Sequence, residues 1–63
     1  MTVTYKTRDS WGNTLLHTIE GVASWTDEKS EFDPYILRIL RDAEGRVLAG
    51  PVIRELFDFE VLA

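Results

Sequence analysis

The stretch Tyr35-Ile-Leu-Arg-Ile-Leu-Arg-Asp-Ala-Glu-Gly-Arg-Val-Leu-Ala49 decides the fold. In an extended chain, one side would present Tyr35, Leu37 and Ile39, and the other Ile36, Arg38 and Leu40. This period of two is typical of a β-strand. In the following Asp42-Ala-Glu-Gly45, the glycine can supply the positive φ of a type I turn with a bulge. Residues 46–49 then return as the second strand. We therefore predict a β-hairpin at the centre of an all-β chain.

The same period of two extends towards the N-terminus. Val3, Tyr5 and Thr7 alternate with polar residues, which predicts a half-buried first strand. A second, longer strand is predicted over residues 14–26. Gly21 near its middle indicates a bulge or a sharp bend, where a long strand can curl from one sheet into another. The sequence leaves open which of the two it is, and a bulge would exchange the two faces after it.

The C-terminal segment has two possible structures. Gly50-Pro51 interrupts the ladder of backbone hydrogen bonds, and residues 52–55 have the length of one 3₁₀ turn. Residues 56–62 alternate again and predict a last strand. A helix over residues 52–60 competes with this strand, because apolar residues there also fall at helical spacing. Phe57 and Phe59 favour the strand.

Together these elements predict a single small domain, residues 1–63, built as a five-stranded antiparallel meander that curls into a partly open barrel. A single helical turn would precede the last strand. This layout resembles the SH3-like and Sm-like barrels. The resemblance is to an arrangement of strands and not to a family motif, so it implies no functional residues.

Length and composition limit what such a domain can do. A chain of 63 residues has a thin margin of stability, on the order of 3–5 kcal/mol, and without cysteine it has neither a disulfide nor a thiolate for zinc. The net charge of −4 argues against binding nucleic acid through its phosphates. The chain shows neither a secretory signal nor an apolar run that would span a membrane. We expect a cytoplasmic protein, stabilised by a second copy of itself.

No set of catalytic residues is recognisable. His17 is the only histidine, it has no candidate nucleophile at a readable spacing, and we expect it to be packed at the rim of the core. Asp58 and Glu60 alternate on one strand face, but a small barrel leaves no room for a substrate cleft beside them. Glycine-rich phosphate loops are absent from the sequence. We therefore predict no enzyme, no cofactor and no metal site.

The apolar residues lie on both sides of the predicted strands. If one side forms the core, the other side is an apolar patch, and such patches mark interfaces. We predict a self-association surface, in a dimer by preference because dimers are the commonest oligomers. Its members are Leu16, Val22, Ile36, Leu40, Leu48 and Leu56.

Two further surfaces concern a partner. The predicted loop over residues 27–34 is acidic and contains only Lys29 as a basic residue; its carboxylates belong to Asp27, Glu28, Glu31 and Asp33. Trp11 and Phe32 fall in predicted loops, where an aromatic side chain is either a lid over the open end of the barrel or an anchor for a partner.

Three functions remain open. The first is a non-enzymatic interaction module that self-associates and binds a protein partner. The second is an acidic inhibitor, of the kind that phages or plasmids encode, which mimics the charge of nucleic acid to block a basic partner. The third is an oligomer that binds a small ligand or nucleotide between subunits, using His17, Arg38 or Arg41. The sequence identifies neither the partner nor the number of subunits.

Overall fold

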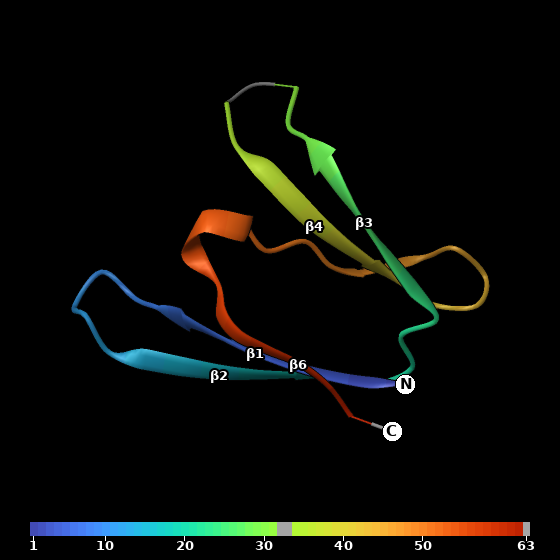
Figure 1. The fold of residues 1–63 in the computed structure, drawn as a ribbon, viewed down its shortest axis with the longest axis horizontal. Coiled ribbons are helices and arrows are strands. Elements are labelled where there is room, and N and C mark those ends of the chain that lie inside the picture. Colours follow the sequence, from blue (N-terminus) through green and yellow to red (C-terminus); the bar gives the residue numbers. More distant parts are fainter. Residues whose placement is uncertain (32–33, 63) are drawn as a thin grey trace.

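The computed structural model describes residues 1–31 and 34–62, and these form two antiparallel sheets (Figure 1). The elements are β1 (Thr2–Arg8), β2 (Thr14–Ile19), β3 (Ser24–Lys29), β4 (Ile36–Arg41), β5 (Val47–Ala49), the 3₁₀ turn η1 (Ile53–Glu55) and β6 (Phe57–Leu62). One sheet has the order β2-β1-β6 and the other β3-β4-β5. The all-β prediction is confirmed. The five-stranded barrel is not, because six strands form two separate sheets that do not close.

The predicted strand over residues 14–26 is in fact two strands in different sheets. Gly21 has φ +76° and turns the chain at the corner between β2 and β3. There the Val22 N–H donates to the Met1 carbonyl over 2.9 Å, and the Ala23 N–H donates to the Arg41 carbonyl over 2.8 Å. Residues 22 and 23 therefore tie the first sheet to the second. Of the two alternatives for Gly21, the sharp bend between sheets is confirmed.

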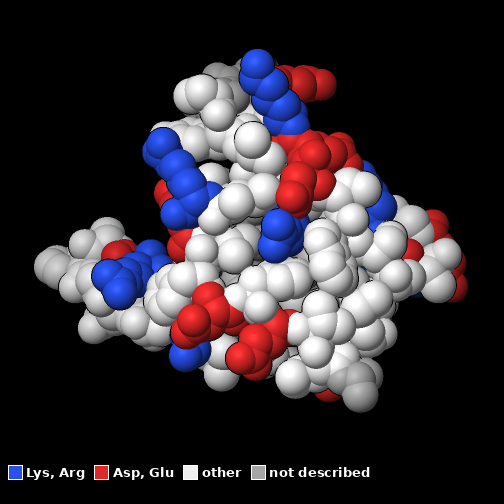
Figure 2. All heavy atoms as spheres, in the orientation of Figure 1, with Lys and Arg blue, Asp and Glu red and all other residues white. Residues whose placement is uncertain are grey.

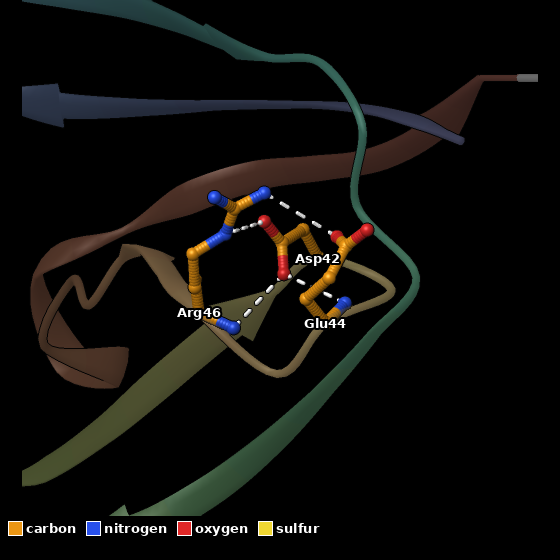
Figure 3. Close-up of polar contacts among 3 residues, drawn as sticks. All are labelled: Asp42, Glu44 and Arg46. Carbon is orange, nitrogen blue, oxygen red and sulfur yellow. Dashed lines mark hydrogen bonds and ion pairs between the residues drawn. The ribbon is translucent and has the colours of Figure 1, made fainter.

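The predicted hairpin after β4 is confirmed. The Asp42 N–H donates to the Arg46 carbonyl, the Gly45 N–H donates to the Asp42 carbonyl, both over 3.0 Å, and Gly45 has φ +82°. The register between β4 and β5 shifts between Leu40 and Arg41, as expected for a bulge. Figure 3 shows that the Asp42 carboxylate also accepts the backbone N–H groups of Glu44 and Arg46.

The C-terminal segment forms a 3₁₀ turn and then a strand, so the strand prediction is confirmed and the competing helix is wrong. β6 pairs with β1, at the centre of the first sheet. The register of this pair shifts between Thr4 and Lys6, where Asp58 has φ +52°. Pairing with β1 takes up the backbone groups of β6 that a helix would have bonded internally.

The core is small and lies at the corner where the sheets meet. Only four of the described residues are buried: Val3, Tyr5, Val22 and Leu40. Half-buried apolar side chains pack around them, among them Trp25 and Phe59, whose rings meet edge to face at 5.2 Å. The strand predicted over residues 35–41 is confirmed as β4, but burial does not alternate along it, and the side that contains Leu40 faces this core.

Away from the corner the two sheets diverge. Most close backbone contacts between strands lie within each sheet, and seen along the shortest axis the β1–β2 and β3–β4 hairpins point in different directions (Figure 1). We call these hairpins the first and second arms. The Cα radius of gyration is 11.9 Å, against about 10.6 Å for a compact chain of this length. The accessible surface of 4531 Å² likewise exceeds the roughly 4,100 Å² expected for this mass.

Across residues 1–31 and 34–62, no helix is long and apolar enough to pass through a membrane.

Candidate functional site

The predicted self-association residues do not all lie on the surface. Leu16, Ile36 and Leu48 are exposed, with Leu16 at 65%. Val22 and Leu40 belong to the core of the chain itself, because the corner at Gly21 turns Val22 inwards and Leu40 pairs with Trp25 across β3 and β4. Leu56 is half-buried against that core. Only the first three remain available to a partner.

Other exposed apolar side chains were not among the predicted ones. They lie mainly on β2, β5 and β6, which are edge strands of their sheets. These side chains are Met1, Leu15, Val47, Val61 and Leu62, of which Val47 is 60% exposed. Period-two patterning missed them because it assumes that one side of every strand is covered, whereas the sheets here diverge.

The acidic segment that was predicted as a loop over residues 27–34 begins within β3. Asp27, Glu28 and Lys29 lie in this strand and not in a loop, so the predicted boundary at residue 27 is wrong. Pairing with β4 extends the strand because each of its residues has a partner in the register. Glu31 is exposed, and Asp33 and Phe32 lie outside the described residues.

Both strand carboxylates are engaged with arginines of β4. The Arg38 Nε and Nη2 atoms donate to the two Asp27 oxygens over 2.9 and 3.2 Å. These hydrogen bonds hold the pKa of Asp27 below its ordinary value. The Glu28 carboxylate accepts the Thr26 hydroxyl over 2.6 Å and lies 3.0 Å from Arg41 Nη1, and both contacts lower its pKa. The negative charge of this strand is therefore partly neutralised within the chain.

The turn of the first arm repeats the geometry of the turn after β4. Asp9 accepts the N–H groups of Trp11 and Asn13 on its Oδ1 atom, each over 2.9 Å. The Gly12 N–H donates to the Asp9 carbonyl, and Gly12 has φ +82°. Trp11 lies in this turn and is 87% exposed.

His17 packs within the first sheet, on the side that faces the core. Its Nε2 atom lies 2.7 Å from Thr7 Oγ1, and its ring stacks on Tyr5 at 4.7 Å. Burial raises the pKa of the Tyr5 hydroxyl. No group of three or more histidine and carboxylate side chains is placed to hold a metal among the residues that the structure describes. These contacts position the imidazole and bring no reactive partner to it.

Two surface depressions flank η1. The larger, of about 370 Å³, is lined by Arg8, Arg54, Glu55, Leu56 and Phe57. The smaller, of about 210 Å³, is lined by Pro34, Tyr35, Ile36, Ile53 and Arg54. Sequence reasoning named neither Arg8 nor Arg54 as a site residue. No local motif joins them, because only the pairing of β6 with β1 brings the chain around Arg54 towards Arg8.

No protein-family model, curated protein or solved structure matches the chain. Its function is therefore inferred from the geometry described above.

Proposed function

We propose that the protein is a non-enzymatic interaction module that self-associates, as a symmetric dimer, and binds a protein partner in the cytoplasm. The observation that carries this proposal is the imbalance of its apolar residues. Within the described parts of the chain, four residues form the core, while nine large apolar side chains are exposed. Exposed apolar side chains that gather in a patch are typical of interfaces, and six of these nine lie on the edge strands β2, β5 and β6. The acidic, cysteine-free composition supports the cytoplasm as the compartment.

The strand arrangement supports association between copies. Among the residues that the structure describes, each sheet has three strands, so β2 and β6 in one sheet and β3 and β5 in the other pair on one side only. An edge strand offers unpaired N–H and carbonyl groups to another chain. Exposed apolar residues such as Leu16 and Val47 lie on these edges, where pairing with a second copy would cover them.

Trp11 supports the binding of a protein partner. An indole that is 87% exposed on a turn held by four backbone and side-chain bonds loses little conformational freedom when it is bound. Tryptophan is enriched among the residues that dominate binding energy at interfaces. We assign it the role of an anchor in preference to a lid, because no described residue covers it.

The two other functions have weaker support. An acidic inhibitor needs free carboxylates, yet Asp27 and Glu28 already bond to arginines. A ligand site built on Arg38 or Arg41 would have to break the same ion pairs.

The test is the molar mass in solution, measured by light scattering after size exclusion over about 10–500 µM. We expect a dimer that dissociates at the low end of this range. Leu16→Ser, Ile36→Ser and Leu48→Ser each remove an exposed aliphatic side chain, and at least one should weaken the dimer about tenfold or more, since a buried side chain of this size contributes roughly 1.5–3 kcal/mol. Ala43→Ser, in the exposed turn after β4, is the matched control. A monomer at every concentration would contradict the proposal.

A further inference from the structure

The depression of about 370 Å³ beside η1 contains two arginines from distant parts of the chain. Arg8 reaches it from the end of β1, and Arg54 reaches it from η1. Lys and Arg side chains appear on both sides of the opening between the two arms in Figure 2. With two arginines against Glu55, the depression is basic on a chain whose net charge is −4.

These two arginines differ from the other three. Arg38, Arg41 and Arg46 each pair with a carboxylate at 2.8–3.0 Å. Over residues 1–31 and 34–62, Arg8 and Arg54 take part in no ion pair. Their positive charges are therefore available to a ligand without breaking an existing contact.

Both guanidinium groups lie near an aromatic ring. The Arg8 Cζ atom lies 5.3 Å from the centre of the Phe57 ring, and the Arg54 Cζ atom lies 4.1 Å from the centre of the Tyr35 ring. A cation–π contact does not use the N–H groups of a guanidinium as hydrogen-bond donors, so they can still donate to a ligand. Phe57 lines the same depression as Arg8, whereas Tyr35 lines the smaller depression on the other side of Arg54.

We propose that Arg8 and Arg54 form a binding site for the phosphate group of a small organic phosphate. A planar carboxylate is satisfied by a single guanidinium, as Asp27 is by Arg38, whereas the tetrahedral oxygens of a phosphate accept donors that arrive from two directions. Leu56 and Phe57 supply an apolar wall for the organic part of the ligand. This site lies within one chain and does not depend on self-association.

Glu55 also lines the depression and sets a second expectation. Its carboxylate repels an anion, so removing its charge strengthens the binding of phosphate at the neighbouring arginines. Glu55→Gln therefore raises the affinity, while replacing either arginine lowers it. Opposite effects from adjacent positions distinguish a real site from general attraction to a basic protein.

The experiment is an NMR titration of the ¹⁵N-labelled protein with phenyl phosphate, followed on backbone amides and on the arginine Nε–H groups. We expect saturable shifts centred on Arg8, Arg54 and Phe57, with weaker binding of inorganic phosphate, which lacks the ring. Arg8→Gln and Arg54→Gln should each weaken phenyl phosphate binding about tenfold. Arg46→Gln is the matched control, because it removes the same charge from an exposed turn outside the depression, and it should leave the affinity within about twofold.

Three results would overturn the proposal: shifts that never saturate, an equal loss of affinity in all three glutamine variants, or benzoate binding as tightly as phenyl phosphate. Both arginines are exposed, so their replacements should keep the amide spectrum of the folded protein. Arg8→Lys and Arg54→Lys preserve the charge and lose only the planar donor group. An affinity lowered in these lysine variants as well would support recognition by the guanidinium itself.

Discussion

The turn of the first arm and the turn after β4 have the same backbone and differ in what they present. Each begins with an aspartate whose Oδ1 atom accepts N–H groups two and four residues later, and each has a glycine at φ +82° in its fourth position. In the third position one turn has Trp11 and the other Glu44. Since the glutamate satisfies the same geometry, the turn itself does not require the tryptophan.

In each turn, the bonds that fold the backbone are separate from the side chain that faces outwards. In the second turn, Arg46 adds a bond from its Nε atom to Asp42 Oδ2 over 2.8 Å (Figure 3). In the first, the corresponding contact from Asn13 to Asp9 Oδ2 is 3.5 Å, near the limit for a hydrogen bond. The turn after β4 is therefore the more tightly bonded of the two. The first turn has the exposed aromatic side chain.

Among single substitutions in the two turns, replacing either glycine should cause the largest loss in the free energy of unfolding. Gly12→Ala and Gly45→Ala each force a Cβ atom into the left-handed region, which costs roughly 1–2 kcal/mol of unfolding free energy. The added Cβ would meet no atom within 4 Å at either position, so the cost is conformational and should be similar in both turns. Urea denaturation of the two variants measures it. A neutral result for either alanine would show that its turn is not as described.

Lowering the pH should reduce the stability that the turn after β4 contributes. The backbone N–H of Arg46, followed by its side chain, lowers the pKa of Asp42 in the folded protein. The stabilisation from a lowered carboxyl pKa is complete above the unfolded value of about 3.9 and is lost as the pH falls through the folded value. Asp42→Asn should therefore flatten the loss of stability on acidification. Because the pKa values of Asp27 and Glu28 are also lowered, the stability of the variant should still fall with pH, but less steeply. Urea midpoints of both proteins from pH 6 down to pH 2 measure the difference. An unchanged slope in the variant would contradict the assignment to Asp42.

The smallest effect on stability should come from the third positions. Trp11→Ala and Glu44→Ala remove exposed side chains and should each change the free energy of unfolding by less than about 0.5 kcal/mol. Thermal unfolding of both variants at one protein concentration checks this. A large loss in Trp11→Ala alone would mean that the indole packs against the chain and is not held ready for a partner.

The sequence predicted local structure better than it predicted how the strands assemble. The hairpin at Asp42–Gly45, the 3₁₀ turn and the strand of Phe57 and Phe59 follow from turn chemistry and residue spacing, which act over a few residues. The turn at Asp9 was predicted only as a loop that contains Trp11, because its likeness to the second turn depends on hydrogen bonds and φ angles.

The errors came from long-range structure. Gly21 indicated a bulge or a bend, but it did not show that Val22 bonds to Met1 beside the first sheet while Ala23 bonds to Arg41 of the second. That division decided which residues became core, and it placed Val22 and Leu40 inside. The depression between Arg8 and Arg54 could not be predicted for the same reason, since it depends on the placement of η1 beside the first sheet.

The central claim is that a second copy of the chain supplies the burial that the four-residue core lacks. The most direct test is the midpoint of thermal unfolding at protein concentrations spanning about a hundredfold. If folding is coupled to dimer formation, the midpoint should rise by roughly 10 °C across this range, because mass action contributes about 2.7 kcal/mol and a domain of this size gains several degrees per kcal/mol. A midpoint that does not change with concentration would contradict the claim.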